Sequence, residues 1–389
     1  MTRPVATWHI LTGKYPPHPG GIADYTAMVA TGLASAGDAV HAWTSPAEAE
    51  ALPTPGVVVH RVPRPWSYRG LAAIGRGLNT EPGPHRIVVQ YAPNEFEYQG
   101  MNLQFCRWLL GRGKRGDDVR VMFHEVRYHP VPGDGLARWA MVAVQTAMAR
   151  MLIQASTRLY VSVPGWADLI RAIARHEVPP IVWLPVPSNI PAIDDPEGVA
   201  AIRRQVTPGG EMMIGTFGTY GESTAAPLIA AFAGLLVGRP GRVGLLVGRN
   251  SQAFAARLVD ALPELAARVV ATGGINASDV SRHLQACDLL IQPVLGGVCT
   301  KQTTTMAGLA NGCAIVAGAG RLTEPVWSDE GCVALAASTN AGEFVPIAES
   351  LLANVEERAR LGVLARSVYD RRFSVARTVE AMRRMDVGP

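Results

Sequence analysis

Lysine is scarce in this sequence, and paired cysteines and long apolar segments are missing. Only Lys14, Lys114 and Lys301 occur among 389 residues, so each lysine stands out against a background of arginine. No apolar run approaches the ~20 residues that a membrane-spanning helix needs, and the run at 5–11 is too short for a secretion signal. The five cysteines form no CxxC pair, which argues against a disulfide framework and a zinc site. We therefore expect a cytoplasmic protein.

Charge and composition exclude two further classes. The formal net charge is +4, and no run of Lys and Arg is present, so a nucleic-acid partner is not expected. The hydrophobic share of 48% excludes a disordered chain. Because a single core stops growing at roughly 250–300 residues, we expect this chain to form two domains.

Several catalytic fingerprints are absent as well. There is no Walker A loop, HExxH or GxSxG, which removes the usual P-loop, zinc-protease and serine-hydrolase interpretations. The stretch 215–221 has GxxGxxG spacing rather than the GxGxxG of dinucleotide-binding domains, which disfavours a nicotinamide-dependent dehydrogenase. No two aspartates stand two positions apart, so Lys, Arg and helix dipoles would neutralise a bound diphosphate. We expect no metal and no cofactor.

Short apolar runs alternate with helical periodicity through both halves of the chain. In the first half the pattern predicts strands at Ala6–Leu11, Val57–Val62, Ile87–Gln90, Val119–Phe123 and Leu159–Val161, and helices from Ile22, at Met101–Leu110 and at Leu136–Ala155. In the second half it predicts strands at Met212–Thr216, Val243–Val247, Val269–Thr272, Leu289–Gln292 and Ala314–Ala317, and helices at Pro227–Val237, Gln252–Ala267, Asp279–Ala286, Thr303–Ala310 and Ser374–Met385. Strands separated by helices imply two α/β domains with mostly parallel sheets.

Prolines divide the two halves. They interrupt the periodicity across Val182–Ile190, which is typical of a linker. Ligands of open α/β sheets bind beyond the carboxyl ends of the strands. The natural site is therefore the cleft between the two domains.

Two segments of the first half could carry chemistry. The loop Tyr15–Asp24 places Gly20 and Gly21 just before a helix, where free N–H groups suit an anion or a sugar hydroxyl; an ordinary turn explains the same glycines equally well. His124 stands at the end of a strand, where it could donate to a substrate hydroxyl or serve as a structural histidine.

The strongest candidate segment lies between Gln292 and Gly312. A strand ends at Gln292, a glycine pair loosens the loop, and Thr300, Lys301 and Thr303 then stand at the start of a helix. A lysine, hydroxyls and unpaired N–H groups at one helix start indicate a phosphate site. The alternative is a capped helix with a solvated lysine.

In its motif order the chain resembles the GT-B glycosyltransferases of family 4. The resemblance runs over nearly the whole length. It rests on Tyr15–Thr26, Phe123–Glu125, Val186–Pro191, Ile214–Gly218, Leu246–Arg249, Cys287–Pro293, Leu309–Val316 and Tyr369–Met382. It implies an α/β GT-B fold, two Rossmann-like doubly wound domains facing across a cleft. The first domain, 1–186 with the returning helix 374–389, would bind the acceptor, and 187–373 a nucleotide sugar.

The resemblance also implies an activity: transfer of a sugar with retention and without metal, with the nucleotide-diphosphate sugar as co-substrate. The resulting assignments are His124 as the catalytic residue; Gly20, Gly21, Arg249, Thr300, Lys301 and Thr303 at the donor diphosphate; Gly218, Gly297, Cys299 and Glu324 at the donor sugar or nucleoside; and Tyr15, Asp24 and Glu125 at the acceptor. One departure stands out: Cys299 and Ala307 occupy the positions of the family's paired glutamates.

Two functions follow from this pattern. One is a metal-independent glycosyltransferase acting on an unidentified acceptor, a glycan, glycolipid or small metabolite. The other is a non-catalytic GT-B pseudoenzyme or partner subunit, which the missing glutamates favour. The mild basic charge leaves a peripheral membrane contact open.

Overall fold

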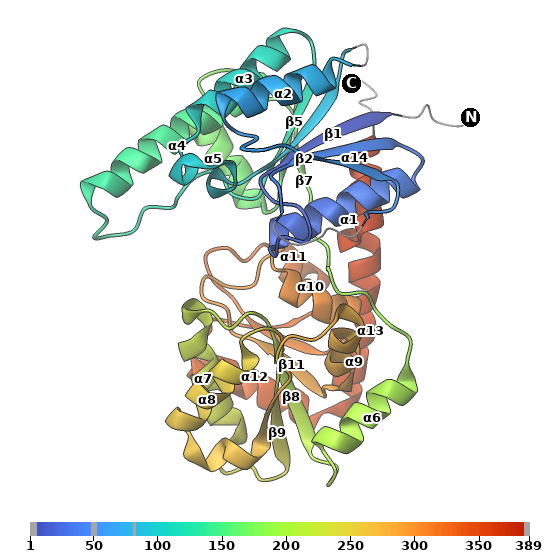
Figure 1. Cartoon of the computed structure of the whole chain (residues 1–389). Helices are drawn as coiled ribbons and strands as arrows, with labels where there is room; N and C mark the ends of the chain where they lie inside the picture. Colours follow the sequence, from blue (N-terminus) through green and yellow to red (C-terminus); the bar gives the residue numbers. More distant parts are fainter. Residues whose placement is uncertain (1–5, 48–52, 81–82, 385–389) are drawn as a thin grey trace. The chain divides into compact units, whose positions relative to one another are not determined.

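The chain folds into two compact units. The computed structural model describes residues 6–47, 53–80 and 83–384. Unit 1 comprises Met1–Pro185 and Val375–Pro389, and unit 2 comprises Val186–Ser374 (Figure 1). Within the described residues, no helix combines the length and apolarity needed to cross a bilayer.

Unit 1 is built on a seven-stranded parallel sheet in the order β3-β2-β1-β4-β5-β6-β7. The strands are β1 (Thr7–Thr12), β2 (Ala39–Thr44), β3 (Val57–Arg61), β4 (Arg86–Tyr91), β5 (Asp118–Phe123), β6 (Arg158–Val161) and β7 (Ile181–Trp183). The α-helices are α1 (Gly21–Ser35), α2 (Tyr68–Leu78), α3 (Leu103–Lys114), α4 (Leu136–Ala155), α5 (Pro164–Ile173) and α14 (Val375–Arg383). The strand order reverses between β1 and β4.

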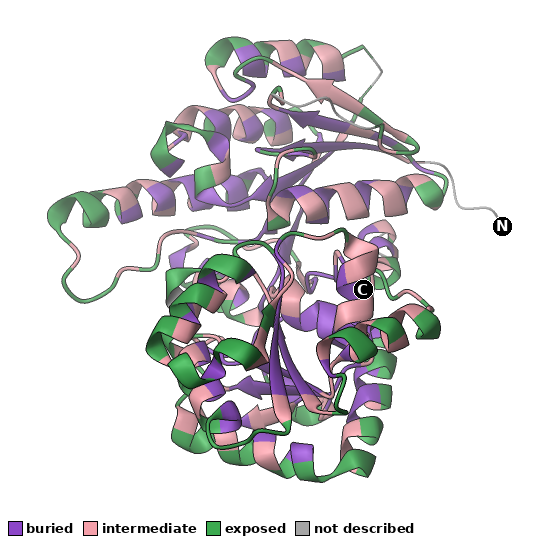
Figure 2. Ribbon diagram, turned by 60° about the horizontal axis from the view of Figure 1, so that its bottom comes forward, coloured by how far each residue is buried: buried purple, intermediate pink, exposed green. Residues whose placement is uncertain are grey.

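The central strands of unit 1 are apolar almost throughout because helices cover both faces of the sheet. Trp8, Ile10 and Leu11 of β1 are fully buried, as Figure 2 shows for the strands in general. One large cluster joins Leu11 and Val89 to Phe105 of α3 and Leu152 of α4. The sheet and these helices therefore form a rigid base for the loops at the carboxyl ends of the strands.

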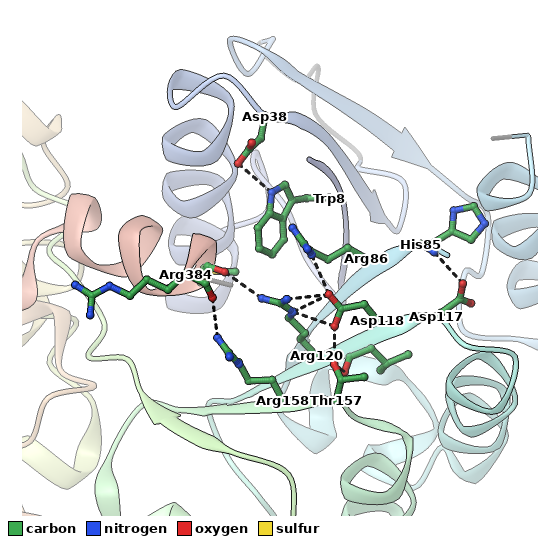
Figure 3. Close-up of polar contacts among 12 residues, drawn as sticks. Trp8, Asp38, His85, Arg86, Asp117, Asp118, Arg120, Thr157, Arg158 and Arg384 are labelled. Carbon is green, nitrogen blue, oxygen red and sulfur yellow. Dashed lines mark hydrogen bonds and ion pairs between the residues drawn. The ribbon is translucent and has the colours of Figure 1, made fainter. Parts of the chain in front are cut away.

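The final helix, α14, packs on α1 within unit 1. A Cβ at Gly32 of α1 would lie 2.7 Å from Cγ2 of Val379, so the glycine permits close approach. Arg120 of β5 donates to the carbonyl of Met382 at 3.0 Å, and Arg158 of β6 to that of Arg384 at 3.1 Å (Figure 3). The end of α14 is thus held on the first sheet.

Unit 2 repeats the architecture with six parallel strands in the order β10-β9-β8-β11-β12-β13. They are β8 (Met212–Phe217), β9 (Arg242–Val247), β10 (Val269–Ala271), β11 (Leu289–Gln292), β12 (Ile315–Gly318) and β13 (Ala334–Ala336). The α-helices are α6 (Pro196–Val206), α7 (Glu222–Leu236), α8 (Ser251–Ala261), α9 (Ala277–Ala286), α10 (Thr303–Ala310), α11 (Val326–Glu330), α12 (Ala341–Ala353) and α13 (Val355–Val368). Here the order reverses between β8 and β11.

The sequence pattern misplaced several boundaries, among them the start of α7, which is Glu222 instead of Pro227, and the end of α8, which is Ala261 instead of Ala267. The predicted linker Val182–Ile190 begins inside β7, because residues 181–183 complete the edge of the first sheet by pairing with β6. The predicted helix Ser374–Met385 is α14 at Val375–Arg383, preceded by one π turn at Tyr369–Phe373. Met385 lies outside the described residues.

Candidate functional site

A pocket opens at the point where the strand order of unit 2 reverses. Adjacent parallel strands whose connections leave in opposite directions create a crevice at their carboxyl ends. β8 and β11 are such a pair, and the pocket beside them has a volume of about 190 Å³. It is lined by Thr216, Phe217, Gly218, Thr219, Tyr220, Gly221, Thr224, Leu228, Gln292, Pro293, Val294, Gln302 and Thr304.

The wall that follows β8 is held by Tyr220. This residue has a φ of 55°, and its hydroxyl lies 2.9 Å from the carbonyl oxygen of Thr216 and 3.0 Å from that of Val247. Its ring stacks on Phe254 of α8 at 5.1 Å. Burial raises the pKa of the Tyr220 phenol above its ordinary value, so the side chain acts as a neutral brace. Gly218 beside it leaves the pocket open.

The opposite wall is the loop between β11 and α10. Gln302 is the N-cap residue of α10, and its amide nitrogen donates to the carbonyl of Gly297 at 3.1 Å. Its amide oxygen accepts from the backbone N–H of Cys299 at 3.3 Å. Gln302 therefore holds the loop closed on itself at the start of the helix.

Gly297 lies where two backbone segments approach closely. Its φ is +87°, and a Cβ there would lie 2.2 Å from the backbone nitrogen of Gly320. Any larger residue would push the two loops apart. Gly297 was predicted at the donor sugar, but the pocket lining does not include it.

Glu324 is a buried anchor for the same loop. Its carboxylate accepts from the backbone N–H of Thr300 at 2.9 Å, from the Thr300 hydroxyl at 2.6 Å and from Nε1 of Trp327 at 2.7 Å. Burial raises the pKa of Glu324, and the hydrogen bonds from Thr300 and Trp327 oppose that rise. The Glu324 carboxylate is thus engaged with protein donors.

These contacts describe the surroundings of three residues of the predicted site. Thr300 and Cys299 are fully buried, and the Thr300 hydroxyl donates to Glu324. Burial also raises the pKa of the Cys299 thiol to about 11. The buried side chains of Thr300, Cys299 and Glu324 pack inside the loop before α10. None of the three belongs to the pocket lining.

The helix start itself lies where the pattern predicted it. α10 spans Thr303–Ala310, and Gln302 and Thr304 line the pocket. Lys301 lies between Thr300 and this lining and is partly buried, and Arg249 is exposed just after β9. Gly218 is the predicted donor residue that the pocket lining includes, whereas Lys301, Thr303 and Arg249 lie outside it.

The other predicted residues belong to unit 1. Gly20 has a φ of 151° and is the N-cap residue of α1, and the first turn of α1 contains Asp24. Tyr15 is fully buried in the loop after β1. Gly20 and Gly21 lie at the start of α1, where the pattern predicted a helix start. They belong to unit 1, whereas the pocket at β8 and β11 belongs to unit 2.

His124 lies at the carboxyl end of β5, close to the point where the order of the first sheet reverses. It is 7% exposed, and its Nε2 lies 2.9 Å from Oε1 of Gln90 at the end of β4. The ring of Tyr25 from α1 meets the imidazole edge to face, with centroids 4.9 Å apart. Trp166 donates to the carbonyl oxygen of His124 at 3.0 Å. Glu125, the next residue, is exposed.

Sequence reasoning missed several pocket residues. Thr219, Tyr220 and Thr224 lie in or just after the GxxGxxG stretch, which a dinucleotide fingerprint does not describe. Gln302 and Thr304 flank the predicted Thr303. Gln90 gave no motif signal, because its partner His124 is 34 positions away. Gln302 and Thr304 could have been found because they lie next to Thr303, the predicted start of the helix.

Comparison with known proteins supplies the fold. No protein-family model matches the chain, and no curated protein sequence matches it. Similar solved structures include a sucrose-phosphate synthase from Thermosynechococcus elongatus, with a TM-score of 0.71, 15% identity and coverage of 97% of this chain and 98% of that one. WaaG, a glycosyltransferase involved in lipopolysaccharide biosynthesis, has a TM-score of 0.68 and 17% identity, over 96% of this chain and 99% of WaaG. HepE of Anabaena, solved with UDP and glucose, has a TM-score of 0.68 and 13% identity, over 97% of this chain and 98% of HepE.

The chain has the GT-B fold. The likeness covers nearly all of both chains, and each unit has the parallel, doubly wound sheet of this architecture. The predicted α/β class with two Rossmann-like, doubly wound domains is confirmed. At these identities the likeness concerns the fold, and activity has to be argued from the site.

Proposed function

We propose that this protein is a glycosyltransferase that takes a sugar from a nucleotide-diphosphate sugar bound in unit 2. The observation that carries the proposal is the pocket at the reversal between β8 and β11, next to the start of α10. The N–H groups of a helix start and the positive end of its dipole favour an anion. Neighbouring structures support the donor class, since HepE was solved with UDP-glucose and a trehalose-6-phosphate enzyme with UDP-2-fluoro glucose.

The pocket is suited to part of such a donor. Its volume of about 190 Å³ is below the ~300–1,000 Å³ of sites that enclose a whole drug-sized ligand. The lining offers the hydroxyls of Thr219, Thr224 and Thr304 and the amides of Gln292 and Gln302. We infer that the diphosphate and the group next to it bind there, with Lys301 supplying positive charge from the adjacent loop.

The proposed chemistry is retaining and independent of metal. Among the described residues, no group of three or more His, Cys, Asp or Glu is suited to a metal ion. We infer metal independence because the sequence has no pair of aspartates two positions apart and because Lys301 can supply positive charge. The protein would act by positioning the donor and stabilising charge on the leaving diphosphate. Unit 1 would bind the acceptor near Tyr15, Asp24, His124 and Glu125.

A binding protein without activity is the second candidate. It is favoured by Cys299 and Ala307, which are both fully buried at the positions of the paired glutamates in the resembling family. Neither side chain can bind a sugar hydroxyl as a carboxylate does. The two candidates share the donor pocket and differ in turnover.

A nucleotide-sugar panel tests the proposal. UDP, UDP-glucose and other nucleotide sugars are titrated by thermal shift, where a ligand at 100 times its dissociation constant adds about 2.7 kcal/mol of stability. Lys301→Ala is expected to weaken diphosphate binding at least tenfold. Lys301→Arg keeps the positive charge and is expected to retain most of the wild-type affinity. Release of UDP in the presence of acceptor extracts separates the enzyme from the binding protein. A flat panel would overturn the donor site.

A further inference from the structure

A second cavity lies on unit 1, between α2 and α3. Its volume is about 690 Å³, several times that of the pocket in unit 2. The lining residues are Tyr68, Leu71, Ala72, Gly75, Arg76, Asn79, Gln104, Arg107, Trp108, Arg112 and Arg115. We call it the α2–α3 groove. It is formed wholly within unit 1 and has no part in the proposed donor site.

The charge of the groove has one sign. Four arginines line it, and the part of the lining that the structure describes contains no acidic residue. Neither Tyr68–Leu78 nor Leu103–Lys114 contains Asp or Glu, whereas Arg69 and Lys114 add further positive charge on the same two helices. Acidic residues three or four positions from an arginine would offset its charge on a helix surface, so two adjacent helices without an acid concentrate positive potential in the groove.

One of the four arginines is neutralised and three are not. Arg112 is 4% exposed, pairs with Asp117 at 2.5 Å and donates to Asn79 Oδ1 at 2.9 Å. Arg76, Arg107 and Arg115 are exposed. Across the described ranges 6–47, 53–80 and 83–384, the hydrogen bonds and ion pairs include none from these three guanidinium groups. The groove therefore presents three uncompensated charges beside one fixed in place.

The remaining lining combines an apolar part with the polar side chains of Tyr68, Asn79 and Gln104. Leu71, Ala72 and Gly75 come from α2, and the half-buried ring of Trp108 from α3. A Cβ at Gly75 would lie 3.8 Å from Nε1 of Trp108, so the helices approach closely at the floor. An apolar floor lowers the local dielectric constant and strengthens the attraction of the arginines for an anion.

We infer that the α2–α3 groove is an anion site that binds a phosphate group. A phosphate carries about two negative charges and three acceptor oxygens, which matches several guanidinium groups better than a single carboxylate does. The planar fork of arginine binds phosphate in a bidentate manner. The phosphate belongs either to the headgroup of an anionic lipid or to a soluble phosphate compound, and the apolar floor packs against the part of the ligand next to the phosphate.

The experiment measures both sources with the full-length chain. In the first arm, the protein is sedimented with phosphatidylglycerol–phosphatidylcholine vesicles and with phosphatidylcholine vesicles alone. In the second arm, inorganic phosphate is titrated into the Gly218→Leu variant, in which the donor pocket is filled, against sodium chloride of equal ionic strength. Each arm is repeated with Arg107→Glu/Arg115→Glu and with the control Arg175→Glu, an exposed arginine of unit 1 away from the groove.

Phosphate binding in either arm, reduced at least tenfold by the double variant and unchanged by Arg175→Glu, supports the site. The tenfold reduction in binding is expected because each basic residue near an anionic surface contributes about 1 kcal/mol, and the double variant reverses two such charges. The arm that responds identifies the source as lipid or soluble compound. The inference is overturned if neither arm shows binding, or if the double variant and the control bind alike. A melting temperature close to that of the wild type verifies that each variant is folded.

Discussion

The hydroxyl of Thr300 donates a 2.6 Å hydrogen bond to Oε1 of Glu324, 24 positions further along the chain, and both side chains are buried. This contact joins the loop before α10 to the loop after β12. It fixes the wall against which the start of α10 is placed. We therefore expect loss of the Thr300 hydroxyl to lower the stability of the protein.

Thr300→Val keeps the shape of the side chain and removes the donor. The buried Glu324 carboxylate then loses one of its hydrogen bonds, which costs about 1–3 kcal/mol and lowers the melting temperature by several degrees. Differential scanning calorimetry measures the change. Thr339→Val, at a partly exposed threonine of the same unit, is the control. A melting temperature equal to that of the control would show that the contact contributes nothing.

Gly218 keeps the pocket of unit 2 open. A Cβ at this position would lie 3.9 Å from Cγ2 of Thr304, so a small side chain fits, whereas the branches of Leu would enter the space between β8 and β11. Gly218→Leu is expected to weaken UDP-sugar binding at least tenfold, with a change in melting temperature below about 3 °C. Gly241→Leu, where a Cβ meets no atom within 4 Å, is the control. Full affinity in Gly218→Leu would place the donor elsewhere.

His124 and Gln90 form a buried pair at the carboxyl ends of β4 and β5. If His124 contacts the transferred sugar or the acceptor, His124→Ala lowers turnover by about a hundredfold while donor affinity changes less than threefold. Gln90→Leu removes the acceptor of the Nε2–H bond and is expected to lower turnover about tenfold, because the imidazole loses its orientation. Donor consumption and isothermal titration measure the two quantities. Parallel losses of turnover and affinity would indicate a structural role.

His9 makes the first unit sensitive to acid. It is 3% exposed, and burial, followed by the nearby imidazoles of His41, His85 and His60 and the charge of Arg112, lowers its pKa to about 3. Because the unfolded chain then binds the proton more readily, stability rises with pH. The contribution is complete above the unfolded pKa of 6.5 and is lost as pH falls towards 3, by up to about 1.4 kcal/mol per pH unit.

Urea unfolding between pH 4.5 and 8 tests this effect. The midpoint is expected to fall steeply below pH 6.5 in the wild type and less steeply in His9→Leu, which has no group to titrate. His176→Asn, at an exposed histidine of the same unit, should retain the wild-type slope. Equal slopes in His9→Leu and the wild type would remove His9 from the explanation.

Local patterns predicted most of the regular structure. The helices Leu136–Ala155 and Thr303–Ala310 have the bounds that the pattern predicted, because apolar residues recur at helical spacing in both. The strands β2, β7 and β13 were missed, and so were the helices α2, α5, α6, α11, α12 and α13. β2 carries His41 and Thr44 among its apolar residues, and β7 and β13 have three residues each, so none of the three has the run length that distinguishes a strand from a loop.

The sequence by itself determined the fold class, the two α/β halves and the position of the helix start at α10, since apolar spacing and helix-start residues act over a few positions. Only the tertiary structure decided which polar side chains face the pocket. Thr300 turns to Glu324 and His124 to Gln90, and those partners come from separate strands and loops. A buried polar group must satisfy its hydrogen bonds wherever the fold brings a partner, and no local pattern contains that information.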